Sequence, residues 1–320
     1  MSRVLETARN VVDASRQVRV DKQALVHFSR KLLADGIKSP AWDYRYHFYD
    51  GSEETVSYLL ALDSLNFCFW PASGNMKWEI KYGSRSLSGY YALAASLKHA
   101  FESGIPITRA DYLSKLSLGK LKRILGGRGK LQLMENRLQI LNELGHVLLR
   151  EYSGKAHKLV EAAGESSVKL VRLLTQKLQS FRDVADYMGH KVFLYKRAQI
   201  FVADLYGAFD GKSWGRFTDM GRLTAFADYK LPQVLRYLGI LRYTQGMARK
   251  VDQKVFLEAG GTEEVEIRAN TIWAVELIRQ ELYRMGKCLR AFEIDWILWN
   301  LGQHEQFKVK PYHRTVSIFY

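Results

Sequence analysis

The chain has 320 residues, 47% of them hydrophobic and 12% aromatic, which suffices for one large domain or two packed lobes. Its net charge of +15 indicates an anionic partner (nucleic acid, nucleotide phosphate or a membrane surface) or a solvated basic face that aids solubility. Two cysteines exclude a disulfide framework, and the absence of an apolar leader or a run of about 18 apolar residues predicts a soluble, cytoplasmic protein with no membrane partner.

The N-terminal part combines helical and strand-like patterns. Residues 4–35 carry apolar side chains at helical spacing and predict two helices. Residues 44–48 alternate aromatic and polar side chains with a period of two, and residues 76–82 alternate similarly before Gly83, which permits a turn. We therefore expect a small β element in this part of the chain.

The remaining sequence is mainly helical in pattern. Residues 191–206, inside a helical region that runs from residue 89 to about 209, are apolar on nearly all sides and predict a central buried helix. The glycine-rich run 126–129 indicates a lobe boundary or a flexible loop. Further on we expect a loop over 210–222, helices over 231–243 and 271–299, and a loop followed by a short strand over 310–320. The prediction is a mainly α fold with a small β element, in a single domain over residues 1–320 that is built of two packed lobes.

Short catalytic motifs are absent from the sequence. It contains no Walker loop, no Rossmann glycine fingerprint and no His-Glu-x-x-His zinc motif, so we expect neither a metal nor a cofactor. What remains is a set of carboxylates in apolar runs, namely Asp63, Asp204, Asp228 and Asp295. Burial makes such groups costly unless they are paired or functional. Each one alone is better interpreted as a salt bridge or a helix cap, and Asp204 has available partners in Lys196 and Arg197.

Asp228 has the most informative setting of the four. It lies between Phe226 and Tyr229, shortly before Pro232, whose missing N–H suits the first turn of an amphipathic helix. A carboxylate at the start of a helix, flanked by aromatic rings, can be partly desolvated and still ionised. Such a group suits chemistry on a cation-like sugar next to a stacked base.

Five separate runs of the sequence, in matching order, resemble one known family. They cover residues 63–70, 195–205, 223–233, 266–269 and 311–320. The family is the queuosine salvage protein family, whose members are queuosine 5'-phosphate N-glycosylase/hydrolases, and the likeness extends from about residue 20 to the end. It implies a fold related to the helical DNA glycosylases. It also implies hydrolysis of the N-glycosidic bond of queuosine 5'-monophosphate, which releases queuine and ribose 5-phosphate.

The resemblance also implies roles for individual residues. Asp228 is the expected nucleophile or transition-state stabiliser, and Phe226 is expected to stack on the base. The substrate-binding residues are expected to be His47, Phe226, Asp295, Trp296, Asn300, Tyr229 and Asp204. The family often has an aspartate at the position of Asn300, and an amide there cannot pair with a cation.

The chemistry of the substrate suggests contacts for these residues. Deazaguanine offers N–H donors that the carboxylate of Asp295 can accept in bidentate fashion, and a neutral His47 could accept a hydrogen bond from the amine or hydroxyls of the side arm of queuine. The 5'-phosphate needs cationic donors, for which Arg236 and Arg268 are equally available on composition. The phosphate-binding candidates are Lys196, Arg197, His313 and Arg314.

Two other functions remain open from the sequence. A DNA base-excision glycosylase fits the basic charge, but the segment 231–236 lacks the two glycines of the turn with which such enzymes hold a DNA backbone. A non-enzymatic tRNA-binding protein would carry aromatic residues within basic patches, whereas here they mostly flank acids in apolar runs. We therefore expect the small-molecule substrate and its product queuine as partners, and no stable nucleic-acid partner.

Overall fold

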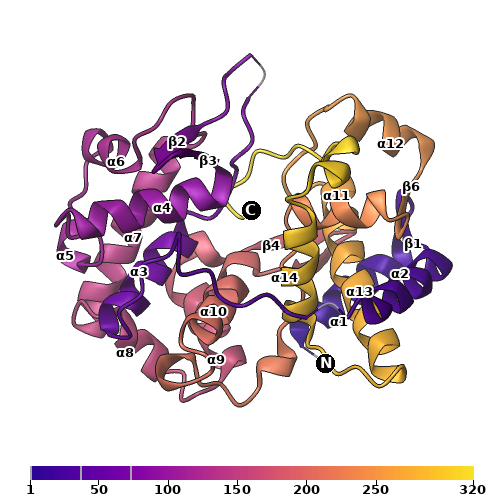
Figure 1. The fold of residues 1–320 in the computed structure, drawn as a ribbon, viewed down its shortest axis with the longest axis horizontal. Coiled ribbons are helices and arrows are strands. Elements are labelled where there is room, and N and C mark those ends of the chain that lie inside the picture. Colours follow the sequence, from indigo (N-terminus) through magenta and orange to yellow (C-terminus); the bar gives the residue numbers. More distant parts are fainter. Residues whose placement is uncertain (1, 37, 73) are drawn as a thin grey trace.

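The computed structural model describes residues 2–36, 38–72 and 74–320, and most of this chain is helical (Figure 1). The α-helices are α1 (Arg3–Ala14), α2 (Lys22–Ala34), α3 (Glu53–Ser64), α4 (Gly89–Glu102), α5 (Ala110–Leu113), α6 (Leu118–Leu125), α7 (Met134–Tyr152), α8 (Ala156–Glu161), α9 (Ser167–Lys177), α10 (Lys196–Ala208), α11 (Lys230–Tyr237), α12 (Gln245–Asp252), α13 (Thr262–Arg284) and α14 (Ala291–Leu301). Short 3₁₀ helices are η1 (Gln179–Phe181), η2 (Ser213–Gly215), η3 (Met220–Arg222) and η4 (Glu305–Val309). None of these described helices is both long and apolar enough to cross a lipid bilayer.

The strands form separate antiparallel pairs. The pairs are β1 (Val18–Val20) with β6 (Leu241–Tyr243), β2 (Glu79–Tyr82) with β3 (Arg85–Ser88), and β4 (Val184–Tyr187) with β5 (His190–Phe193). The prediction of a mainly α fold with a small β element is confirmed. The predicted likeness to helical DNA glycosylases stays a prediction.

Two large hydrophobic cores organise the helices. The first core holds apolar residues of α3, α4, α6, α7, α9 and α10. The second unites α2, near the N-terminus, with α11, α13 and α14 from the last third of the chain. Figure 1 shows these two groups side by side, with the C-terminus between them. The two predicted N-terminal helices are present as α1 and α2, and both pack against α13.

The predicted strand over 44–48 is wrong. This segment forms turns, because Asp43 accepts hydrogen bonds from Arg45 and its main-chain oxygen contacts the ring of His47. Local side-chain bonds of this kind compete with strand pairing. The alternation over 76–82 does give a strand, since β2 begins at Glu79 and turns at Gly83 into β3.

The structure also corrects three segments of the helical prediction. The β4–β5 hairpin interrupts the predicted helical region, with Met188 and Gly189 both at positive φ in its turn, as a tight hairpin requires. Gly239 and Gly286, also at positive φ, follow the ends of α11 and α13, so neither 231–243 nor 271–299 is one continuous helix. The predicted strand at the end of 310–320 is wrong, because this segment makes only an isolated bridge, between Arg314 and Phe256.

The glycine-rich run 126–129 is a loop that packs against the segment leading into β2. Arg128 exchanges two main-chain hydrogen bonds with Glu79. A β-carbon on Gly129 would lie 2.2 Å from the carbonyl oxygen of Lys77, so only glycine fits this approach. The predicted lobe boundary near these residues stays a prediction.

Segment 64–68 begins with the last residue of α3, is otherwise irregular, and runs through the protein interior without a strand partner. The buried guanidinium of Arg137 on α7 donates to the main-chain oxygens of Leu65 and Phe67, at 2.6 Å each. Arg197 on α10, also buried, donates to the oxygen of Ser64 and to that of Ser180. Two arginine side chains thus replace the hydrogen bonds that a neighbouring strand would supply.

Candidate active site

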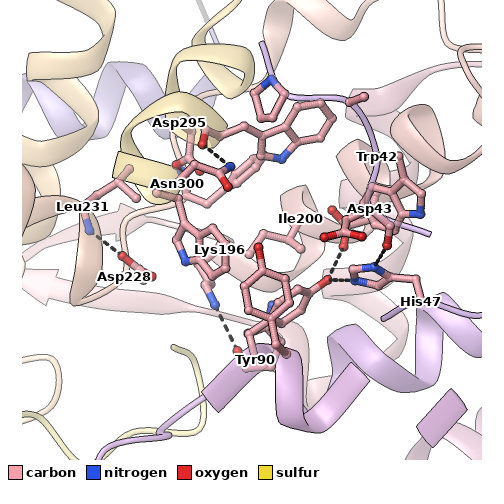
Figure 2. Close-up of a pocket in the computed structure, with 18 of the residues that line it drawn as sticks. Trp42, Asp43, His47, Tyr90, Lys196, Ile200, Asp228, Leu231, Asp295 and Asn300 are labelled. Carbon is pink, nitrogen blue, oxygen red and sulfur yellow. Dashed lines mark hydrogen bonds between the residues drawn. The ribbon is translucent and has the colours of Figure 1, made fainter. Parts of the chain in front are cut away.

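A cavity of about 570 Å³ collects residues from both helical groups (Figure 2). Its walls come from the loop at 40–47, the start of α4, one face of α10, the loop before α11, and α14. The lining residues are Pro40, Ala41, Trp42, Asp43, Tyr44, Arg45, His47, Asn66, Tyr90, Tyr91, Lys196, Ile200, Asp204, Phe226, Asp228, Leu231, Asp295, Trp296, Trp299 and Asn300. Apolar and aromatic walls with a few converging polar groups are typical of a small-molecule site.

Asp228 lies in one wall, immediately before α11. Its Oδ1 accepts hydrogen bonds from the main-chain N–H groups of Lys230 at 2.7 Å and Leu231 at 2.9 Å, which have no partner inside the helix. Burial raises the pKa of this carboxyl, while the charge of Lys196 and the two N–H donors lower it. The overall result is a pKa above the ordinary value, because burial outweighs the N–H donors and the charge of Lys196.

Asp295 connects α14 to the same loop. Its Oδ1 accepts a hydrogen bond of 2.7 Å from the main-chain N–H of Phe226, two residues before Asp228. Burial raises the pKa of Asp295 well above its usual range; the bond from Phe226 opposes this, and the charge of Asp228 adds to it. One oxygen is thus engaged in the fold, which leaves the other to contact a ligand.

Lys196 is the cation between these carboxyls. It begins α10 and is 4% exposed, with its Nζ donating to the main-chain oxygen of Asn66 at 3.0 Å. Burial lowers its pKa to about 8, against the opposing effect of Asp228. The main-chain N–H of Lys196 donates to Asp183, which forms a buried ion pair with Arg268.

His47 lies at the opposite side of the cavity from Asp228, with Tyr90 between them (Figure 2). The Nδ1 of His47 is 2.6 Å from the main-chain oxygen of Asp43, and its Nε2 is 2.9 Å from the hydroxyl of Tyr90. Burial lowers the pKa of His47 to about 4, so the ring is neutral near pH 7. The carbonyl contact fixes the proton on Nδ1 and makes Nε2 an acceptor.

Asp204 completes this side of the cavity. Its Oδ2 is 3.2 Å from the hydroxyl of Tyr90. The predicted pairing with Lys196 or Arg197 is absent, because those cations donate to main-chain oxygens, and no ion pair involves Asp204 among the described residues. Burial raises the pKa of Asp204 to about 7, opposed by the hydrogen bond from Tyr90.

A smaller cavity of about 180 Å³ adjoins the first and shares Asn66, Tyr90, Tyr91, Lys196, Asp228 and Trp299 with it. Its remaining cationic lining consists of Lys77, Lys230 and Lys308. Burial lowers the pKa of Lys230, and the charge of Asp228 opposes that shift, while Lys308 and Lys77 add to it. The lysines are therefore close enough to repel one another, which suits a site for an anion.

Most of the residues singled out from the sequence lie together. The large cavity contains His47, Lys196, Asp204, Phe226, Asp228, Asp295, Trp296 and Asn300, and Tyr229 lines the smaller one. Three proposed phosphate ligands, Arg197, His313 and Arg314, line neither of these cavities. Arg197 holds main-chain oxygens, and Arg314 lies over the ring of Trp70, 5.6 Å from its centroid. His313 contacts the hydroxyl of Tyr320, and burial lowers its pKa to about 3, so it carries no charge for a phosphate.

Sequence reasoning missed several wall residues. Asn66, Tyr90 and Trp299 lie in ordinary apolar runs, and nothing in their spacing marks them. The position of Lys230 could have indicated a role in the site, because it follows Asp228 by two residues at the start of the predicted helix. Within the described ranges, no group of three or more His, Cys, Asp and Glu side chains is arranged to hold a metal ion.

Comparison with known proteins identifies the family. The sequence matches the family model described as queuosine salvage protein over residues 46–320. A relative from Sphaerobacter thermophilus is 46% identical over 99% of this chain and 97% of its own length. Relatives from Mus musculus and Dictyostelium discoideum are each 36% identical, over 98% and 99% of this chain and 98% of their own lengths. All three are named queuosine 5'-phosphate N-glycosylase/hydrolase. The resemblance seen in the sequence is thereby confirmed, and the chain belongs to the queuosine salvage protein family.

Proposed function

We propose that this protein hydrolyses the N-glycosidic bond of queuosine 5'-monophosphate and releases queuine and ribose 5-phosphate. One observation carries the proposal: the family match spans residues 46–320. This range contains the lining residues of the large cavity from His47 to Asn300, and only those at 40–45 precede it. The relatives that bear the name of this activity are similar over nearly their whole length. The family match therefore covers most of the residues that line the cavity, which supports the proposal.

Asp228 is the group that we assign to the bond-breaking step. Departure of the base builds positive charge on C1' and O4' of the ribose, as in other glycoside hydrolyses. A fixed carboxylate about 4 Å from that charge stabilises it by about 4 kcal/mol at an effective dielectric of roughly 20, which corresponds to about three decades in rate. The same carboxylate could act as nucleophile or activate water, and both roles fit its position.

The base fits between the aromatic and amide groups in the middle of the cavity. Phe226, Trp296 and Trp299 offer ring faces for stacking. The second oxygen of Asp295 can accept from an N–H of the deazaguanine. Asn300 donates from Nδ2 to the main-chain oxygen of Trp296, so its Oδ1 is the atom that can accept from the substrate.

The lysine-lined cavity is the place that we assign to the 5'-phosphate. Asp228 and Lys196 line both cavities, so a nucleotide with C1' beside Asp228 can extend its phosphate toward Lys77, Lys230 and Lys308. A phosphate dianion among lysine ammonium groups forms charge-assisted hydrogen bonds. This replaces the proposed roles of Arg197, His313 and Arg314.

Base release should be measured in parallel on queuosine 5'-monophosphate, the nucleoside queuosine, queuosine-modified tRNA and DNA that contains damaged bases. We expect release from the monophosphate to exceed release from the nucleoside, because only the monophosphate engages the lysines. Intact tRNA and DNA should remain unprocessed. Preferential release from DNA would favour a base-excision glycosylase, and tight binding of tRNA without release would favour a binding protein.

A further inference from the structure

The end of the cavity away from Asp228 contains a pair of carboxyl groups with unusual surroundings. Lys196, Ile200 and Asp204 follow each other at intervals of four on one face of α10 and all line the cavity. The rise of an α-helix places Asp204 about 12 Å along the axis from Lys196. Behind it lies Asp63, which is fully buried and whose carboxyl interacts directly with that of Asp204.

Among the described residues no basic side chain forms an ion pair with either carboxyl of this pair, although the charges of Lys196 and Arg197 lower the pKa of Asp63 against the larger effect of burial. Within the described residues, the carboxyl of Asp63 interacts with the side chains of Asp204 and Asn66. The nearest basic side chains, Lys196 and Arg197, donate to main-chain oxygens instead. Two carboxyl groups in contact share a proton, because they cannot both ionise in a buried place. The arrangement leaves a carboxylate without an ion-pair partner in the wall of the cavity.

The neighbouring polar groups are acceptors as well. The Nε2 of His47 needs a donor, and so does Asp204, yet Tyr90 has a single hydroxyl proton for both contacts. The surrounding walls are the rings of Trp42, Tyr90 and Trp299. Electron-rich ring faces, a carboxylate without an ion-pair partner and a shortage of hydrogen-bond donors together match a ligand that carries a positive charge and N–H groups.

We propose that Asp204, supported by Asp63, is the counter-ion for a protonated amine attached to the 7-position of the deazaguanine, and that the site selects bases that carry such an amine. The inference rests on the proposed function, in which the side arm of queuine carries a protonated secondary amine. With C1' at Asp228 and the base in the middle, the arm points toward the end formed by His47 and Asp204. Asp204 thus determines specificity, separately from bond cleavage.

Two synthetic substrates of matched size test the proposal. These are 7-aminomethyl-7-deazaguanosine 5'-monophosphate, whose aminomethyl arm is positively charged at neutral pH, and its counterpart with an uncharged 7-hydroxymethyl arm. We expect wild-type kcat/KM to favour the aminomethyl substrate by about 10- to 100-fold, the range for a hydrogen bond to a buried charge. Asp204→Asn should reduce that preference to within about threefold, mainly by slowing the aminomethyl substrate. Asp63→Asn should reduce it in the same direction.

Asp210→Asn, at an exposed position just after α10, is the matched control and should keep the wild-type preference. The proposal is overturned if the wild-type enzyme does not distinguish the two substrates, a result that requires no variant to fold. It is also overturned if folded Asp204→Asn loses activity on both substrates equally. Failure of the wild-type enzyme to release queuine from queuosine 5'-monophosphate would instead contradict the proposed function.

Discussion

The two ends of the cavity present the same chemical group, a buried carboxyl, in opposite surroundings. Asp228 receives two main-chain N–H bonds and lies near Lys196 and the lysine-lined cavity. Asp204 and Asp63 contact each other and pair with no cation in the described part of the chain. The difference teaches that environment can give the same group different roles: we propose that Asp228 stabilises the transient positive charge of the ribose, and that Asp204 binds the permanent positive charge of an amine.

Removing the charge of Asp228 tests this comparison with the largest expected effect. Asp228→Asn keeps the shape and can still accept from the N–H groups of Lys230 and Leu231, but it cannot balance the charge that develops on the ribose. We expect kcat for base release from queuosine 5'-monophosphate to fall by about three decades, with queuine binding retained. Near wild-type release, measured by single-turnover chromatography, would contradict the assignment.

Lysine substitution in the smaller cavity is expected to have an intermediate effect. Lys230→Ala should raise KM for the monophosphate by about tenfold or somewhat more, through loss of a charge-assisted hydrogen bond, and should leave hydrolysis of the nucleoside unchanged. Lys212→Ala, at a side chain that is 80% exposed, is the control. An equal loss on both substrates would place the phosphate elsewhere.

The smallest expected effect is on the pH dependence of stability, and it tests whether Asp204 titrates as its surroundings indicate. The pKa of Asp204 is about 7, against an ordinary value of 3.8. A raised folded-state pKa contributes stability that is fully present below pH 4 and is lost as pH rises toward 7. The amide of Asp204→Asn does not titrate. The Tm of this variant relative to that of the wild-type protein should therefore rise by a few degrees between pH 5 and pH 8. A difference in Tm that is constant across this range would mean that Asp204 does not titrate there.

Sequence patterns predicted elements with a strong local signal and missed those that depend on distant contacts. The start of α11 was predicted because Pro232 lies in its first turn. The apolar sequence around Asp204, Asp228 and Asp295 indicated three residues that do line one cavity. The turn at 44–48 was not predicted, because its alternating pattern is typical of a strand and the hydrogen bonds of Asp43 stabilise a turn instead.

The predicted phosphate ligands that line neither cavity have a similar explanation. Arg197 and His313 occur in sequence runs shared with the family, but the structure buries them among main-chain and aromatic groups. Lys77 and Lys308 are more than 200 residues apart and meet only through tertiary folding. A single sequence does not indicate that such residues share a cavity.

The way in which segment 64–68 is held has a consequence for the order of folding. Its main-chain oxygens depend on Arg137 and Arg197, which lie about 70 and 130 residues further along the chain. Asn66 in this segment in turn holds the ammonium group of Lys196. Contacts of such sequence separation form late, because loop closure has to precede them. We therefore expect catalytic competence to arise in the last step of folding, after most of the helical content has formed.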